Sequence, residues 1–117
     1  MRRLVFRLER PHHEGGRQSW VGLADVWLTL RPLRGRLALR SGVAEQVATH
    51  EARLRWRDDV KAGMRFRRRS QVLEIHTVED VGQRHRRLSC LCEERRPVET
   101  GLAPPEADNN TGTPDDD

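Results

Sequence analysis

Aromatic residues are scarce in this chain. Phe, Trp and Tyr together make up 4% of its 117 residues, and tyrosine is absent. A chain of this length buries only about two-thirds of its unfolded surface, so we expect a thin core that draws on Phe6, Phe66 and the tryptophans Trp20, Trp27 and Trp56. Stacking of unpaired bases normally needs exposed aromatics on a basic surface. Because the aromatic positions alternate toward the predicted core, sequence-specific single-strand binding is disfavoured.

Long apolar runs and most cysteines are missing too. No stretch approaches the roughly 20 apolar residues that cross a bilayer, and the basic start of the chain lacks the features of a secretion signal. We therefore expect no membrane partner and a reducing cytoplasm as the place of synthesis. Cys90 and Cys92 share one face of a predicted strand, which does not suit a mutual disulfide. No Cys/His pair at metal spacing accompanies them, so we predict two buried thiols, no metal and no cofactor.

Motifs of common enzyme sites are likewise missing. No glycine-rich phosphate loop and no GKS or GKT triplet occurs, and no serine has the strained context of a hydrolase nucleophile. The acidic pairs Asp58-Asp59 and Glu79-Asp80 fall at predicted turns, where such residues serve solvation and local hydrogen bonding. We do not expect an enzyme.

Short runs of alternating apolar and polar residues dominate what is present. The clearest are Leu4, Phe6 and Leu8 in the first run and Ala52, Leu54 and Trp56 in a later one. This period-2 pattern places one face of a strand in a core and the other in water or against a partner. Arginine fills most of the polar positions, a bias that GC-rich codon usage explains as well as function does.

Six short strands are expected, over about residues 3–10, 20–31, 47–57, 64–68, 71–81 and 86–94. Pro11 is predicted to end the first and Pro32 the second, with a loop over residues 11–19. Residues 33–46 are predicted to form one long loop that carries a short helix. The fold class is therefore mainly β, a small antiparallel β-barrel (or sandwich) of about six strands.

The charge is unevenly distributed. All 22 Lys and Arg lie in residues 1–96 beside 12 Asp and Glu, a net charge of +10, whereas residues 97–117 hold six acids and no base. We predict a barrel domain over 1–96 and an extended acidic tail over 97–117 rich in Pro, Gly and Asn. The tail is either a solubilising segment or an acidic arm that lies on a basic face of the same or a neighbouring subunit.

Two arginine clusters stand out, one over residues 67–69 and one over residues 84–87. Each is interpreted as a solvated loop, as positive charge that faces DNA, or as a salt-bridging surface for an acidic protein.

Several segments, in order, resemble the tailed-phage head-closure proteins, also called head–tail joining or stopper proteins, which occur too in phage-like gene transfer agents. Trp20 leads to Leu23-Ala24-Asp25-Val26-Trp27, then Pro32-Leu33 and Gly35. Thr49-His50 precedes Arg53-Leu54-Arg55-Trp56-Arg57, where the family usually has an Arg-aromatic-Arg ending. Gly63-Met64-Arg65-Phe66, Leu73-Glu74-Ile75 and Arg87-Leu88 through Cys92-Glu93 are similar to the last three strands. The resemblance covers about residues 20–94.

The resemblance implies a connector subunit at the head–tail interface of a phage or gene-transfer-agent particle. Six or twelve copies would form a ring between the portal or adaptor and the tail terminator or tail tube, and packaged double-stranded DNA would pass through its channel. Candidate residues follow for each contact. They are Arg34, Arg36 and Arg40 for the channel or the adjoining ring, Arg67, Arg68 and Arg69 for a docking edge, and Trp20, Trp27 and Trp56 for the barrel wall or subunit packing.

The alternative function is a small β-barrel protein that binds nucleic acid without sequence preference, similar in outline to an oligonucleotide-binding fold. It predicts a free subunit whose binding weakens steeply with salt. The ring function predicts weak binding of free DNA and assembly with a portal-type complex.

Overall fold

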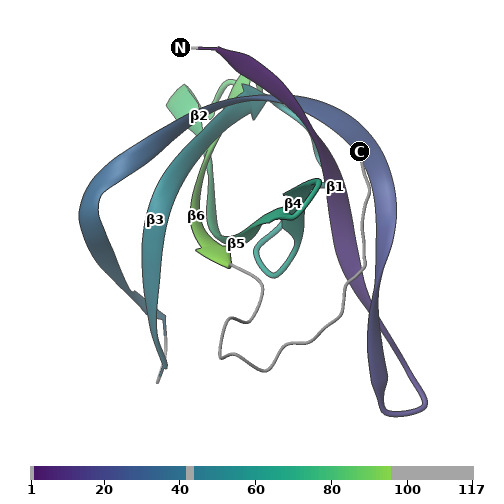
Figure 1. Ribbon diagram of the computed structural model, residues 1–117. Helices are drawn as coiled ribbons and strands as arrows, with labels where there is room; N and C mark the ends of the chain where they lie inside the picture. Colours follow the sequence, from purple (N-terminus) through teal and green to yellow (C-terminus); the bar gives the residue numbers. More distant parts are fainter. Residues whose placement is uncertain (1, 42–43, 96–117) are drawn as a thin grey trace.

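The computed structural model describes residues 2–41 and 44–95 and is a closed antiparallel barrel (Figure 1). Its strands are β1 (Arg3–Glu14), β2 (Arg17–Ser41), β3 (Ala44–Arg55), β4 (Arg65–Arg68), β5 (Gln71–Asp80) and β6 (Arg87–Arg95), and a 3-10 helix, η1 (Val81–Gln83), precedes β6. Around the barrel the order is β1-β2-β3-β6-β5-β4. The predicted fold class, a mainly β antiparallel barrel of six strands, is confirmed. The predicted tail over 97–117 lies outside the described residues.

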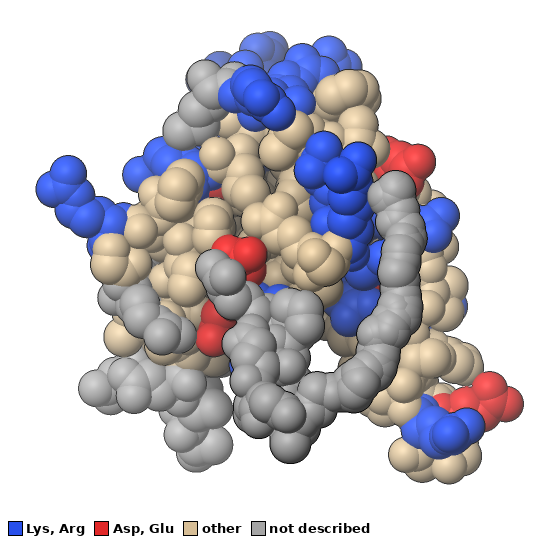
Figure 2. All heavy atoms as spheres, in the orientation of Figure 1, with Lys and Arg blue, Asp and Glu red and all other residues tan. Residues whose placement is uncertain are grey.

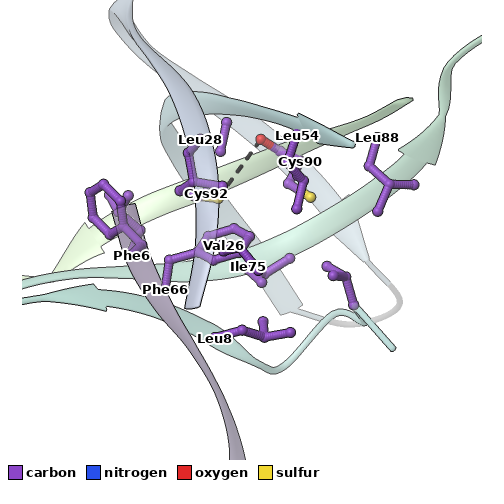
Figure 3. Close-up of a cluster of buried hydrophobic side chains, with 13 residues drawn as sticks. Phe6, Leu8, Val26, Leu28, Leu54, Phe66, Ile75, Leu88, Cys90 and Cys92 are labelled. Atoms are coloured by element: carbon purple, nitrogen blue, oxygen red, sulfur yellow. Dashed lines mark hydrogen bonds between the residues drawn. The ribbon is translucent and has the colours of Figure 1, made fainter. Parts of the chain in front are cut away.

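Alternating positions of the strands fill the barrel interior, as the period-2 pattern predicts. Phe6 and Phe66 are almost completely buried (Figure 3), and Phe66 of β4 lies directly opposite Leu8 of β1. The other large, fully buried side chains are Leu8, Leu28, Leu73, Ile75, Cys90 and Cys92. The two phenylalanines therefore supply most of the aromatic core.

The tryptophans contribute less to the core than expected. Trp27 is 56% exposed, so the expectation that it packs in the core is wrong. Its strand neighbours Val26 and Leu28 point inward, which leaves Trp27 on the outer face. Trp56 is half-buried and packs against the core cluster, and Trp20 is half-buried on the wall.

Cys90 and Cys92 are both buried and free, as predicted. The Cys92 thiol donates a hydrogen bond to the Cys90 carbonyl oxygen at 3.8 Å (Figure 3). Burial raises the pKa of the Cys90 thiol to about 12 and the pKa of Cys92 well above its ordinary value. Both thiols therefore stay protonated and act as small apolar side chains.

β1 and β2 both extend further than predicted. Pro11 lies within β1 and does not end it. β1 pairs with β4 only over Arg7, Leu8 and Glu9, so the later part of β1 is bonded to β2 alone. An edge strand tolerates proline because the missing N–H can face solvent. The expected loop over residues 11–19 is thus a hairpin whose turn consists of Gly15 and Gly16, both at positive φ.

The short helix predicted within residues 33–46 is wrong, and so is the long loop. β2 continues through Ser41 and β3 begins at Ala44. Pro32 lies opposite His50, and the register with β3 then shifts before pairing resumes further along. A bulge of this kind absorbs a proline inside a strand, and Gly35 within it has a φ of 72°.

These long strands make two two-stranded ribbons, one at the β1–β2 turn and one at the β2–β3 turn. β3 pairs with β6 only from His50 to Arg55, so its earlier residues are bonded to β2 alone. Figure 1 shows both ribbons reaching beyond the closed part of the barrel, away from the start of β1. The molecule thus has a closed end and an end with two projecting ribbons.

Candidate functional site

A solvent-accessible groove lies at the end of the barrel opposite the two ribbons, where β1 and β6 begin and β3 ends. Its volume is about 650 Å³. Its lining includes five arginines, two tryptophans and one acidic residue. They are Arg3, Arg53, Arg55, Arg57, Arg87, Trp27, Trp56 and Asp25. We call this set the arginine–tryptophan groove. Figure 2 shows Lys and Arg side chains gathered at this end of the molecule.

The strand register concentrates positive charge in the groove. Arg55 of β3 lies directly opposite Arg87 of β6, and both side chains are exposed. Like charges directly opposite each other on neighbouring strands are destabilising. Among the side chains that the structure describes, neither guanidinium has an acidic partner within ion-pair distance. This pair therefore leaves positive charge uncompensated.

Two other groove arginines have acidic partners. Arg57 donates hydrogen bonds from Nε and Nη2 to the two carboxylate oxygens of Asp59, both at 2.9 Å. This pairing lowers the pKa of Asp59. Arg53 donates from Nε to Glu51 at 3.1 Å. The guanidinium of Arg3 lies instead over the ring of Trp27, 5.4 Å from its centroid. The groove thus combines neutralised and unneutralised arginines.

Glu51 is the centre of an ion-pair cluster on the outer wall between β2, β3 and β6. Its carboxylate accepts hydrogen bonds from Ser89 Oγ at 2.6 Å, from Arg31 Nη2 at 2.7 Å and from Arg53 Nε at 3.1 Å. The residue is only 8% exposed. The hydrogen bonds from Ser89 and Arg31 outweigh desolvation and hold the pKa of Glu51 at about 2. Glu51 is therefore a fixed negative charge that ties three strands together.

Glu9 has the same role on the other side of the barrel. It is 4% exposed and accepts hydrogen bonds from Arg65 Nε at 2.7 Å and from Arg67 Nε at 3.1 Å. The guanidinium of Arg65 also lies 4.1 Å from the ring centroid of Trp20. Arg65 is thus held between a carboxylate and an aromatic face, and it joins β4 to β1 and β2.

The predicted docking edge over Arg67, Arg68 and Arg69 lies at the β4–β5 turn. Arg67 donates one hydrogen bond from Nε to Glu9 Oε2 at 3.1 Å and another from Nη1 to the Arg69 carbonyl oxygen at 3.4 Å. Arg68 is half-buried, and Arg69 is exposed with a φ of 58°. Arg67 therefore also helps to hold the barrel together, and the docking role of Arg67, Arg68 and Arg69 stays a prediction.

The predicted channel residues Arg34, Arg36 and Arg40 all lie in β2, in and beyond the bulge. Arg34 is exposed. The side chains of Arg36 and Arg40 lie outside the described part of the structure. The strand places all three on the β2–β3 ribbon and away from the arginine–tryptophan groove.

The three tryptophans occupy different sites. Trp27 and Trp56 both line the arginine–tryptophan groove, and the Trp56 ring stacks on His85 with a centroid distance of 4.5 Å. Trp20 contacts Arg65 on the wall. The predicted role in subunit packing stays a prediction for all three, and it suits Trp27 best because Trp27 is the most exposed.

One cluster of Glu74, His76 and Glu93 has the composition of a metal site. His76 Nε2 lies 3.0 Å from Glu93 Oε1. Arg95 already lies between the carboxylates, 3.0 Å from Glu74 and 3.8 Å from Glu93. The guanidinium is the counter-ion that a metal would have to displace, so the cluster is an ion-pair network on β5 and β6.

Sequence reasoning did not find the arginine–tryptophan groove or the two buried glutamates. A signal for Glu51 exists, because it is the first residue in a row of outward positions that otherwise hold Arg53, Arg55 and Arg57. No comparable signal marks Glu9, since its partners on β4 are more than fifty residues away. The groove depends on register between strands that are distant in sequence.

The fold and the side-chain contacts define a small closed β-barrel whose outer wall is held together by arginine–glutamate ion pairs. No helix in the described residues is long and apolar enough to cross a membrane.

The sequence profile of the phage head completion proteins matches residues 3–95, and the chain belongs to this family. It is therefore a structural protein of phage heads. The barrel is similar to a chain in the solved structure of the virion of a native gene transfer agent particle, with a TM-score of 0.60 and 18% sequence identity. The match covers 80% of this chain and 96% of that chain. Comparison with curated protein sequences gives no significant match.

Proposed function

We propose that this chain is a head–tail connector subunit that assembles into a ring of six or twelve copies between the portal or adaptor and the tail. The ring continues or closes the DNA channel and docks the tail terminator or tail tube. Membership of the head completion family is the observation that carries this proposal, and the charge and apolar character of the barrel faces support it.

One side face has the character of a subunit contact. Val5 of β1 lies opposite Trp27 of β2, and both are exposed, as is Leu23 nearby on β2. Arg3 and Arg7 flank Val5 on the same strand face. Exposed apolar groups rimmed by charge are typical of protein interfaces. We assign this β1–β2 face to one side of the ring contact.

The complementary side is proposed to be the β5–β6 face, which lies across the barrel from the β1–β2 pair in the strand order. Its outward positions include the acidic Glu79, which is exposed, and Glu74 and Glu93, which are half-buried. A ring needs two different faces that meet head to tail and close by rotation. A basic, apolar face against a face that presents Glu79 beside the ion pairs of Glu74 and Glu93 with Arg95 meets this requirement.

The β2–β3 ribbon is proposed to face the channel or the adjoining ring, through Arg34, Arg36 and Arg40. Contacts of such arginines with packaged DNA would be made to phosphates and so would not depend on sequence. Arg67, Arg68 and Arg69 at the β4–β5 turn are proposed to dock the tail or the adaptor. Residues 1–96 are proposed as the ring-forming unit and residues 97–117 as a separate acidic segment.

The ring is tested by native mass spectrometry of the chain alone and with the portal complex from the same genome. We expect assemblies of six or twelve copies with the portal. Trp27→Asp should abolish them without unfolding the chain, whereas Gln18→Asp, at an exposed position of the same strand, should not. A chain that stays monomeric with its portal, or a Trp27→Asp variant that assembles normally, contradicts the proposal.

The second candidate function is non-specific nucleic-acid binding by a free barrel, which the exposed Trp27 beside groove arginines favours. It predicts that a lone subunit binds short oligonucleotides tightly, with affinity that falls steeply as salt rises. A tight complex of this kind, formed without any portal, would favour it over the ring.

A further inference from the structure

The arginine–tryptophan groove has positive charge without an acidic partner in the described residues. Arg55 and Arg87 are exposed and directly opposed, and neither forms an ion pair there. Asp25 is the one acidic residue among those that line the groove. An anionic ligand would relieve the repulsion between the two guanidinium groups, so the groove is suited to a negatively charged partner.

The aromatic lining narrows the chemistry of that partner. Trp27 and Trp56 both line the groove, and Trp27 is largely exposed. Grooves lined by tryptophan bind proline-containing segments, which lose little conformational entropy on binding. A segment that contains both acidic residues and proline therefore suits both the arginines and the tryptophans that line the groove.

The chain carries such a segment. Residues 97–117 contain six acidic residues and no Lys or Arg, and their composition includes Pro97, Pro104, Pro105 and Pro114. Three of the acids are consecutive, Asp115-Asp116-Asp117. This charge is opposite in sign to that of the groove, and the groove has too few acids of its own to neutralise it.

The segment is long enough to reach the groove. β6 begins at Arg87, which lines the groove, and ends at Arg95. At about 3.3 Å per residue these ends are about 26 Å apart. Residues 96–117, fully extended, span at most about 75 Å. The acidic residues at the end of the sequence can therefore return to the groove of their own chain or reach that of an adjacent copy.

We propose that the acidic segment 97–117 docks in the arginine–tryptophan groove, with carboxylates on Arg55 and Arg87 and its proline-containing part against Trp27 and Trp56. Docking neutralises the basic end of the barrel and keeps free polyanions off it. Trp27 also belongs to the β1–β2 face that is proposed above for the ring contact, so docking applies to a subunit whose β1–β2 face is not covered by a neighbour. The inference does not require ring assembly.

The test uses the full chain with a nitroxide spin label on Thr113→Cys. Cys90 and Cys92 are buried with raised thiol pKa values, so they resist labelling. The readout is the intensity of the three tryptophan indole signals in a heteronuclear NMR spectrum. A tethered segment has an effective concentration in the millimolar range, so we expect Trp27 and Trp56 to lose about half or more of their intensity. Trp20 is the internal control, because it precedes Trp27 by about 23 Å along β2.

Two matched variants separate docking from accidental proximity. Arg55→Gln/Arg87→Gln should restore both signals, whereas Arg10→Gln/Arg17→Gln, which removes two exposed arginines outside the groove, should not. Asp115→Asn/Asp116→Asn/Asp117→Asn should also restore them. If the groove variant does not fold, the spin-labelled wild-type groove is measured in about 0.5 M salt instead. Salt screens exposed ion pairs, so the Trp27 and Trp56 signals should recover there as well. Equal broadening of all three tryptophans, or no broadening, overturns the proposal.

Spin-labelled chains are mixed with isotope-enriched chains that carry no spin label. Loss of the Trp27 and Trp56 signals in this mixture shows that the segment occupies the groove of another copy, and no loss shows that it occupies its own. Either result supports the acidic segment as the occupant. Duplex DNA is the competing ligand. It should bind the triple Asn variant more tightly than the wild type. Equal affinity of DNA for both, with shifts of the Trp27 and Trp56 signals, would make the groove a DNA site and contradict docking of the acidic segment.

Discussion

Two groups of arginines on this barrel look alike in the sequence and differ in the structure. Arg65 and Arg67 donate to the buried carboxylate of Glu9 and so connect β4 to β1. Arg55 and Arg87 are exposed, face each other and have no acidic partner in the described residues. The first pair therefore stabilises the fold, whereas the second leaves charge available for a partner.

The difference between the two pairs lies in the glutamates. A buried carboxylate that accepts several charge-assisted hydrogen bonds fixes the arginines around it. Glu9 and Glu51 are the two acidic residues that are buried in the described structure. Counting arginines therefore says little about function in this chain until each has been matched to a buried acid.

The largest effect is expected from Glu51→Ala. Removing the carboxylate leaves Arg31, Arg53 and Ser89 without their shared acceptor, so the free energy of unfolding should fall by about 2–3 kcal/mol. Chemical denaturation followed by tryptophan fluorescence measures the change. Glu79→Ala, at an exposed position of β5, is the control and should change stability by no more than about 0.5 kcal/mol. Equal losses for the two variants would show that the Glu51 cluster has no structural role.

Acid should weaken the same cluster. The pKa of Glu51 is about 2 in the folded chain against an ordinary value of 4.5. A lowered folded-state pKa contributes stability that is present above the ordinary value and is lost as the pH falls toward 2. Over that window the wild type should lose about 2 kcal/mol more than Glu51→Gln, less than the full shift implies because Arg31 and Arg53 are half exposed and screened. Unfolding free energies at several pH values give this difference, and parallel pH profiles would refute it.

A smaller effect is expected at Glu9. Glu9→Gln keeps the shape of the side chain and removes its charge, so Arg65 and Arg67 lose a charge-assisted acceptor. Stability should fall by about 1–2 kcal/mol, and Trp20 fluorescence should change because Arg65 contacts that ring. Glu14→Gln, exposed on the same strand, should have no measurable effect on either readout. If both variants behave alike, the Glu9 ion pairs do not fix β4.

The strands were predictable because each needs only its own alternation. Phe6, Leu54 and Cys90 point inward as the period-2 pattern requires. Pro11 and Pro32 misled the prediction because their effect depends on neighbours, an edge strand in one case and a bulge opposite His50 in the other. A proline ends a strand only where its N–H is needed for the ladder, and that need is not written in the local sequence.

The candidate sites were less predictable for the same reason. Trp27 was expected in the core, although it alternates with the inward Val26 and Leu28, and its position beside Arg3 and Arg55 depends on the pairing of β1, β2 and β3. Arg67 reads as part of a solvated cluster until Glu9, on another strand, is placed next to it. Long-range register decides which charges meet, and a single sequence specifies that register only weakly.

The most direct test compares the free energies of unfolding of two matched double variants. It asks whether Arg65 and Arg67 stabilise the fold while Arg55 and Arg87 do not. Arg65→Gln/Arg67→Gln and Arg55→Gln/Arg87→Gln each remove two positive charges from neighbouring strand positions. The first should lower stability by about 1–2 kcal/mol, and the second should leave it unchanged or slightly raise it, because it relieves a like-charge pair. Equal losses for both, or a larger loss for Arg55→Gln/Arg87→Gln, would contradict the account.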